Sequence, residues 1–294
     1  MPTLTIRHLT TYRYLRPVAF GEHRMMLRPR DSNDQRVIET SLEIYPQPAS
    51  LHFIVDDFGN QIGIAQFSDC AQELCVESVV CLEQSPPEVS ACHLDERAGR
   101  FPFAYSDQES TDLMLYLERD PVDFHSDPDD EVARWADEFL PTGESIGTFD
   151  LLTRLSQAIH SGFRYRRREA KGVQRAVETL RLGHGSCRDF AMLMIDAARA
   201  LGLAARFASG YLILSSDEHG STHAWAQVYL PGPGWVDFDP TSGSVGKERL
   251  VTVAVAPDPQ HTLPLHGTYV GFASDSLGMD VKVFTRAMTS GGDG

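Results

Sequence analysis

The first 85 residues alternate apolar and polar side chains in the way that is typical of half-buried β-strands. The segments with this alternation are residues 4–12, 38–44 and 74–82. Asp57-Phe58-Gly59-Asn60 lies between two further β-rich segments and is typical of a hairpin turn, because glycine and asparagine tolerate a positive φ angle. The pattern therefore predicts an N-terminal antiparallel β domain over residues 1–85, built as a small sandwich or barrel.

The alternation ends at Pro86-Pro87, and the polar mixture that follows has no period. We interpret residues 86–100 as a linker between two domains. Beyond it, apolar residues recur at the spacing of one helix face. The helices that this spacing predicts lie near residues 110–119, 132–140, 146–163 and 176–182.

The stretch Gly183-His184-Gly185-Ser186-Cys187-Arg188-Asp189-Phe190 places a cysteine where a further helix begins. Ser186 is a favourable N-cap residue, Asp189 sits three positions later as in a capping box, and Gly202 ends the apolar repeat. Cys187 is then the first helical residue, close to unpaired backbone N–H groups and the positive end of the helix dipole. Both favour a thiolate over a thiol, so this is where a nucleophile would be built.

The pattern returns to β-strands after this helix. The β-rich segments are residues 204–214, 221–230 and 234–239, followed by the shorter 268–272 and 279–284. We predict an α+β core over residues 101–290 that includes the C-terminal strands. In this core the helix that begins at Cys187 packs on an antiparallel sheet.

Charge and composition narrow the class of protein. The chain of 294 residues carries a formal net charge of −15, which argues against nucleic acid or an anionic membrane as the main partner. The one dense basic run, Arg164 with residues 166–168, is interpreted as a solvated face. No run of about 18 apolar residues and no leader pattern is present, so we expect a soluble cytoplasmic protein.

The five cysteines are an odd number, and none belongs to a C-x-x-C pair. This usage fits a reducing compartment and gives no sign of a structural metal site. A free cysteine often only fills space in a protein core, so Cys187 alone is a weak argument for catalysis. The argument becomes stronger because His223 and Asp239 follow on two successive predicted strands.

Adjacent strands lie about 4.8 Å apart, so a histidine and an aspartate on neighbouring strands can form a hydrogen bond. His223 could then take the proton of the Cys187 thiol, while Asp239 holds the ring in the right tautomer and stabilises the imidazolium. The sequence therefore predicts a thiolate–imidazolium pair.

Three motifs occur in this order: G-x-C-x-D-x-A at 185–191, H-x-W at 223–225 and W-x-x-x-D-P-T at 235–241. Together they resemble the transglutaminase-like superfamily, a papain-like group of cysteine proteases and acyl transferases. The segments at 8–14, 27–30 and 57–60 look like the bacterial transglutaminase-like N-terminal region, so the resemblance spans nearly the whole chain. It implies a Cys-His-Asp triad at Cys187, His223 and Asp239.

The family's acid precedes Pro-Thr, which selects Asp239 over Asp237; we expect Asp237 to be an exposed neighbour on the strand or to support the site indirectly. Asp189 is assigned to helix capping. Trp225 and Trp235 are expected to pack around the histidine or to wall the acyl site. His184 is a less favoured alternative base.

An oxyanion hole needs hydrogen-bond donors aimed at the developing charge. The backbone N–H of Cys187 is the first such donor. The family often supplies a second donor from a side chain upstream of the cysteine, and we assign that role to Tyr165.

The expected reaction is attack of Cys187 on a peptide or carboxamide carbonyl to form a thioester. Water as the second nucleophile gives a protease or amidase, and a primary amine gives a transglutaminase; we favour hydrolysis. The expected partner is a protein or peptide substrate, with no cofactor and no calcium loop. Two alternatives stay open: a non-catalytic interaction protein, and a metalloenzyme built on Cys187, His184 and His223.

Overall fold

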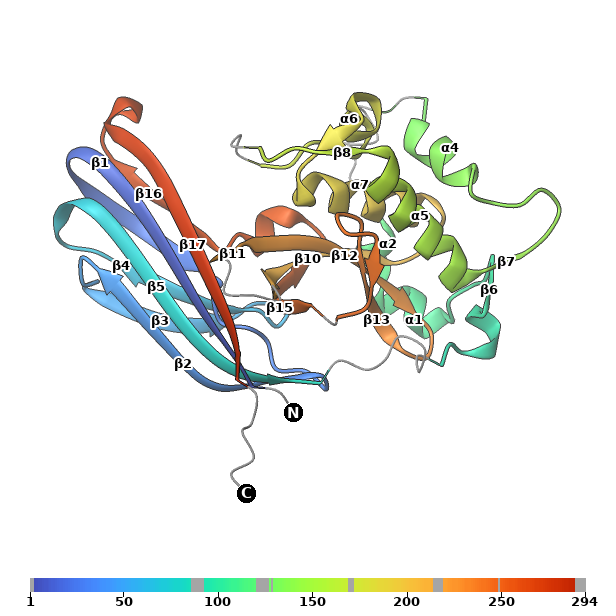
Figure 1. Ribbon diagram of the computed structural model, residues 1–294, viewed down its shortest axis with the longest axis horizontal. Helices are drawn as coiled ribbons and strands as arrows, with labels where there is room; N and C mark the ends of the chain where they lie inside the picture. The colour runs from blue at the N-terminus through green and yellow to red at the C-terminus, as the bar shows by residue number, and fades with distance from the viewer. Residues whose placement is uncertain are drawn as a thin grey trace, which may run out of the picture.

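The computed structural model describes residues 3–85, 93–119, 127, 129–168, 172–213, 219–247 and 249–288. Figure 1 shows a curled antiparallel sheet beside a mixed core, in which helices cover one face of a second sheet. The α+β class predicted from the sequence, with an N-terminal β part followed by a papain-like core, is confirmed. Within the described residues, no helix is long and apolar enough to cross a membrane.

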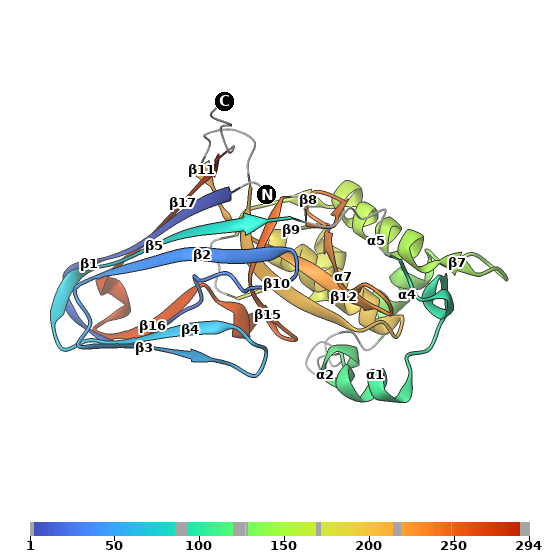
Figure 2. The same ribbon diagram turned by 90° about the horizontal axis from the view of Figure 1, so that it is seen from below.

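The N-terminal part contains five strands that follow one another in the sequence. They are β1 (Thr3–Met25), β2 (Gln35–Tyr45), β3 (Ser50–Val55), β4 (Gln61–Gln66) and β5 (Cys70–Gln84). β1 pairs with β5 from Thr3 to Ala19, with a register shift between Arg13 and Val18, and its last residues, His23–Met25, pair with β4. This change of partner curls the sheet into the two limbs seen in Figure 2, so the strands form one curled sheet in place of a sandwich of two sheets.

The C-terminal strands belong to this same sheet. β16 (Leu265–Val270) pairs with the second half of β1, and β17 (Ser276–Met288) pairs with the first half from Thr3 to Tyr14. The sequence interpretation had placed these strands with the core, which is wrong. A local pattern predicts a strand but not its partner, and here the partner lies at the opposite end of the chain.

The linker predicted over residues 86–100 lies partly outside the described residues, which omit 86–92. Residues 93–100 lead through the short helix η2 (Glu96–Ala98) to β6 (Arg100–Phe101), which pairs with β7 (Ile146–Gly147).

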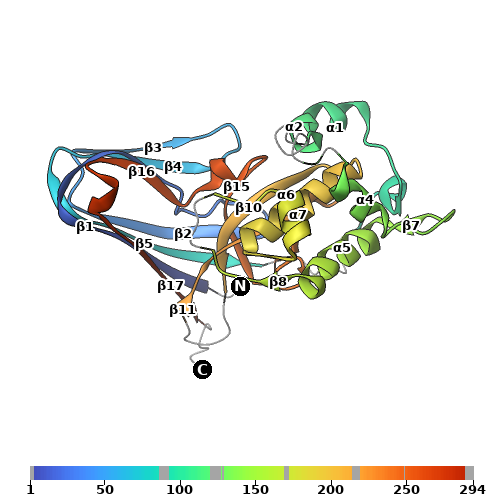
Figure 3. The ribbon, with the colours of Figure 1, turned by 90° about the horizontal axis from the view of Figure 1, so that it is seen from above.

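The helices of the core lie close to their predicted positions. They are α1 (Asp107–Asp112), α2 (Met114–Leu117), α4 (Glu131–Asp137), α5 (Thr148–Gly162), α6 (Ala176–Leu182) and α7 (Cys187–Ala200). Figure 3 shows α7 among α4, α5 and α6, all of which contact it. Every residue of α7 from Asp189 to Arg199 is buried, so this helix is the centre of the core.

The core sheet has the strand order β14-β13-β12-β10-β15. Its strands are β10 (Ala205–Leu212), β12 (Thr222–Leu230), β13 (Gly234–Asp239), β14 (Ser244–Val245) and β15 (Leu250–Ala256). One face, with Ala224, Ala226 and Phe238, packs in the same apolar cluster as α7. Because side chains alternate along a strand, His223 and Trp225 lie on the other face.

Side-chain amides of the N-terminal part form hydrogen bonds with backbone groups on the outer edge of β15. An edge strand presents unpaired N–H and C=O groups, and here three amides from separate segments bond to them. Asn60 is one of these amides, so it joins the N-terminal part to the core. In the predicted turn at residues 57–60, only Gly59 has a positive φ angle, at 77°. The bonds are Gln84 Nε2 to Leu250 O (2.6 Å), Gln35 Nε2 to Thr252 O (2.9 Å), Thr252 N to Gln35 Oε1 (3.2 Å), Asn60 Nδ2 to Val255 O (2.8 Å) and Val255 N to Asn60 Oδ1 (2.9 Å).

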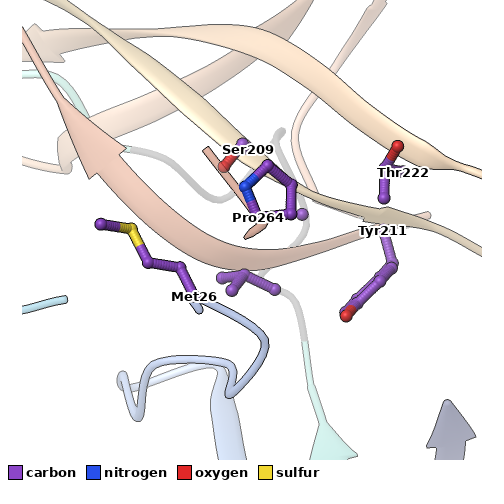
Figure 4. Close-up of a pocket in the computed structure, with 7 residues that line it drawn as sticks. Met26, Ser209, Tyr211, Thr222 and Pro264 are labelled. Atoms are coloured by element: carbon purple, nitrogen blue, oxygen red, sulfur yellow. The ribbon is translucent and has the colours of Figure 1, made fainter. Parts of the chain in front are cut away.

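A small hollow lies at the same junction, between the curled sheet and β10. Figure 4 shows Met26, Ser209, Tyr211, Thr222 and Pro264 around it, and Gly210 and Val253 complete its lining. None of the site residues predicted from the sequence lines this hollow.

Candidate active site

Cys187 begins α7, and a buried carboxylate fixes the chain at this point. Asp189 accepts hydrogen bonds through Oδ2 from the backbone N–H and the hydroxyl of Ser186, both at 2.8 Å. Its Oδ1 accepts from Arg168 Nη1 at 2.6 Å and from the backbone N–H of Gln174 at 2.7 Å. Asp189 therefore has the capping position expected of it. Sequence reasoning missed Arg168 and Gln174, whose contacts depend on a loop folding back onto the helix.

Asp239 lies at the end of β13 and orients His223, the second residue of β12. His223 Nε2 donates to Asp239 Oδ2 at 3.0 Å, and both side chains are buried. Ser242 Oγ donates to the same oxygen at 2.7 Å, and the backbone N–H of Thr241 donates to Oδ1 at 2.9 Å. Burial acts to raise the pKa of Asp239, but these donors and the charge on His223 lower it below its ordinary value.

His223 also forms a hydrogen bond with Cys187. Nε2 is bonded to Asp239, which leaves Nδ1 for Cys187. Burial acts to lower the pKa of His223, but the hydrogen bonds and negative charges of Asp239 and Cys187 raise it to about 10. The imidazole therefore holds its proton at neutral pH, as a thiolate–imidazolium pair requires.

Asp237 is buried rather than exposed, which corrects the expectation of a strand neighbour in solvent. Its Oδ1 accepts from Trp225 Nε1 at 2.5 Å and from Gln227 Nε2 at 2.7 Å. Burial raises the pKa of Asp237. The indole of Trp225 stacks on the ring of His223, with centroids 6.1 Å apart and an interplanar angle of 23°. Trp225 thus packs on the histidine as expected, and Asp237 holds it there.

Trp235 does not lie at the histidine. It packs edge-on against Tyr229 and Tyr116, and the guanidinium of Arg206 sits 4.0 Å from its ring centroid. Arg206 also donates to Gln227 Oε1 at 2.8 Å. Four residues of strand separate Trp235 from Asp239, roughly 13 Å at about 3.3 Å per residue, so the prediction that Trp235 packs around the histidine is wrong.

Tyr165 lies near Cys187. β8 (Arg164–Tyr165) runs parallel to β9 (His184–Gly185), with Tyr165 opposite Gly185. Its ring meets Phe190 of α7 edge-on, with centroids 6.3 Å apart. Burial and the negative charge of Cys187 both raise the pKa of the Tyr165 phenol, so it carries a proton that it can donate.

His184, the alternative base, makes no side-chain hydrogen bond in the described structure, and its buried Nδ1 lacks a partner. No group of three or more histidine, cysteine, aspartate or glutamate side chains is placed to hold a metal ion among the described residues. That includes the set of Cys187, His184 and His223.

Comparison with known proteins identifies the family of this chain. Residues 135–240 match the family model of the transglutaminase-like superfamily, and residues 4–83 match that of the bacterial transglutaminase-like N-terminal region. An uncharacterized protein of Mycobacterium tuberculosis is 30% identical over 293 residues, covering 95% of this chain and 90% of that protein. An uncharacterized protein of Mycobacterium leprae is 27% identical over 304 residues, covering 95% and 98%.

Among solved structures, the "Putative Cysteine Protease from Cytophaga hutchinsonii" superposes with a TM-score of 0.72. It has 17% sequence identity, and the match covers 97% of this chain and 90% of that one, so both parts of the molecule share its fold. Fold and site together define a papain-like cysteine enzyme. The chain belongs to the transglutaminase-like superfamily, in the branch that carries the bacterial N-terminal region.

Proposed function

We propose that the protein hydrolyses peptide or carboxamide bonds through a thioester on Cys187. One observation carries this proposal: His223 bridges Cys187 and Asp239 through hydrogen bonds in a buried setting. A cysteine that only fills space has no need of an imidazole and a carboxylate aligned behind it.

The proposed reaction has two steps. The Cys187 thiolate adds to the carbonyl carbon, and the tetrahedral intermediate collapses as His223 gives its proton to the leaving amine. This breaks the C–N bond and leaves a thioester. Neutral His223 then takes a proton from water, the resulting hydroxide attacks the thioester, and the carboxylic acid leaves with the thiolate restored. Asp239 stays ionised throughout and stabilises the imidazolium each time it forms.

The oxyanion of each tetrahedral intermediate needs two donors. The Cys187 N–H is the first, because the first N–H groups of a helix have no acceptor within the helix. We assign the second to the phenol of Tyr165, which is half-exposed beside Cys187 and protonated at neutral pH. The substrate class is a protein or peptide. The odd number of cysteines supports the cytoplasm as the proposed location.

The test uses unfolded casein as a general protein substrate, in water enriched in ¹⁸O, with and without methylamine. Peptide mass spectrometry then separates the candidate reactions. New C-termini or glutamates that carry ¹⁸O indicate hydrolysis, and methylamine on glutamine indicates a transglutaminase. We expect ¹⁸O products that are absent with Cys187→Ala. Methylamine adducts alone would overturn hydrolysis, and products that persist in Cys187→Ala would overturn the role of the thiol.

A further inference from the structure

Positive charge gathers beside Cys187 in a chain that is otherwise acidic. The whole protein has 41 aspartates and glutamates against 26 lysines and arginines. Residues 164–168 nevertheless contain four arginines, and a fifth, Arg188, follows Cys187 directly. The structure shows that this run does not lie on a remote face.

Backbone pairing holds the arginine run against the residues that precede Cys187. Arg164 N donates to Gly183 O at 2.8 Å, and Arg166 N donates to Gly185 O at 2.7 Å. Alternation within β8 puts the side chain of Arg164 on the opposite side of the strand from Tyr165. The charges of Cys187, Arg167, Arg188 and Asp189 all act on the Tyr165 phenol, so these groups lie near it.

The buried carboxylates of the site pair with other cations than Arg167, and Asp189 neutralises one arginine of the run. Asp189 is buried and pairs with Arg168, and Asp239 is buried and pairs with His223. Arg167 is exposed, and no carboxylate of the described residues forms an ion pair with it. An exposed guanidinium is suited to bind a carboxylate through two parallel hydrogen bonds.

We propose that the substrate is an acidic peptide, and that Arg167 binds a carboxylate of the peptide close to the carbonyl that Cys187 attacks. This inference rests on the proposed function, since it names the substrate class of the same site. Arg167 is then the residue that sets specificity.

The test compares two alkylating reagents of nearly equal size, anionic iodoacetate and neutral iodoacetamide, on the intact protein at low ionic strength. The quantity measured is the ratio of their rates at Cys187, from peptide mass spectrometry, relative to the same ratio at exposed Cys70. Both reagents react with the same thiolate, so the ratio cancels any change in the thiolate fraction. Arg167→Gln and Arg167→Glu are compared with Arg164→Gln, a matched loss of charge on the other side of the strand.

A unit charge about 8 Å away in water changes the local concentration of a monovalent anion about two- to threefold. We therefore expect the ratio to fall about two- to threefold in Arg167→Gln and further in Arg167→Glu. It should change little in Arg164→Gln, and the effect should shrink with added salt. The test is extended with two chloroacetyl peptides that differ only in carrying Glu or Gln. We expect the wild type to react faster with the Glu peptide and Arg167→Gln to lose this preference.

An unchanged ratio in both Arg167 variants, or an equal fall in Arg164→Gln, would overturn the inference. Failure of the proposed function gives a different signature. In that case iodoacetamide alone labels wild-type Cys187 no faster than Cys70 at acidic pH, whatever the ratio of the two reagents.

Discussion

Two carboxylates on β13 lie two residues apart on the same face, and their environments shift their pKa values in opposite directions. Asp239 accepts from an imidazole, a hydroxyl and a backbone N–H, and its pKa is lowered. Asp237 accepts from an indole and an amide at a single oxygen, and burial raises its pKa. Both are almost wholly buried.

The difference lies in the partners. Burial penalises both ionised forms, and an adjacent cation together with hydrogen bonds to the carboxylate can reverse this penalty. Asp239 has such a cation in His223, so its charge serves the chemistry. Asp237 has neutral donors and serves to hold Trp225 against His223. One strand thus carries an ionised orienting group and a structural acceptor.

The largest expected effect is that of Asp239→Asn. It removes the charge that stabilises the imidazolium, so His223 gives up its proton more readily and Cys187 loses its ion-pair partner. We expect the rate of Cys187 alkylation by iodoacetamide at pH 6 to fall about a hundredfold or more. Asp237→Asn is the matched control, because Asn Oδ1 can still accept from both Trp225 and Gln227. A comparable fall in the two variants would contradict the assignment of roles.

Asp237→Ala tests the structural role of Asp237 through the stability of the protein. It leaves the N–H of Trp225 and the amide of Gln227 buried without an acceptor, which costs about 1–3 kcal/mol. Urea unfolding should show this loss for Asp237→Ala and not for Asp237→Asn. Equal stability of Ala and Asn at this position would mean that the hydrogen bonds do not hold Trp225.

The pH dependence of unfolding should differ in sign between the two carboxylates. The pKa of Asp239 is lowered in the fold, so its contribution is present above pH 3.8 and is lost as pH falls through the folded pKa. The pKa of Asp237 is raised, so the wild type loses stability relative to Asp237→Asn as pH rises above 3.8. Urea titrations from pH 3 to 7 on both Asn variants should show these opposite slopes, and parallel slopes would refute them.

His223 makes the free energy of unfolding depend on pH in the alkaline range as well. Its folded pKa is raised to about 10 from 6.5, so its contribution is complete below pH 6.5 and is lost as pH rises through about 10. In Cys187→Ala one of the groups that raises this pKa is gone. An NMR titration of the imidazole should therefore give a lower pKa for His223 in Cys187→Ala than in the wild type, and an unchanged value would mean that the thiol and the imidazole are not coupled.

The smallest effect is expected for Ser242→Ala, which removes one of the donors to Asp239 while His223 and Thr241 remain. A single hydrogen bond to a charged group contributes about 1.5–3 kcal/mol at most, and the exposed position of Ser242 reduces this. We expect a fall of tenfold or less in the alkylation rate, well below that of Asp239→Asn. A fall as large as that of Asp239→Asn would show that Ser242, rather than His223, sets the charge state of the carboxylate.

The helix start at Cys187 and its capping box could be predicted from sequence, because capping depends on residues within one turn. The strands that carry His223 and Asp239 were predictable from alternation. The burial of Asp237 was not, since a strand pattern does not say which face a neighbouring indole will cover. Ser242 and Arg168 were missed because their partners depend on how a turn and a loop fold back.

The N-terminal part shows the same limit on a larger scale. Its strands were evident, but the pairing of β17 with β1 joins the two ends of the chain, and no local pattern encodes that contact. Asn60 was interpreted as a turn residue, whereas its amide bonds to Val255 on the edge of the core sheet. In both places the element could be predicted and the partner could not.

The most direct test of the ion pair is the pH dependence of iodoacetamide labelling at Cys187, in the wild type and in His223→Ala, with Cys70, Cys75, Cys81 and Cys92 as internal references. We predict that wild-type Cys187 is labelled at pH values well below the pKa of an ordinary thiol, which is about 8.5. His223→Ala should lose this reactivity at low pH. If Cys187 follows the reference cysteines in both proteins, the thiolate–imidazolium pair does not exist and the account of the site is wrong.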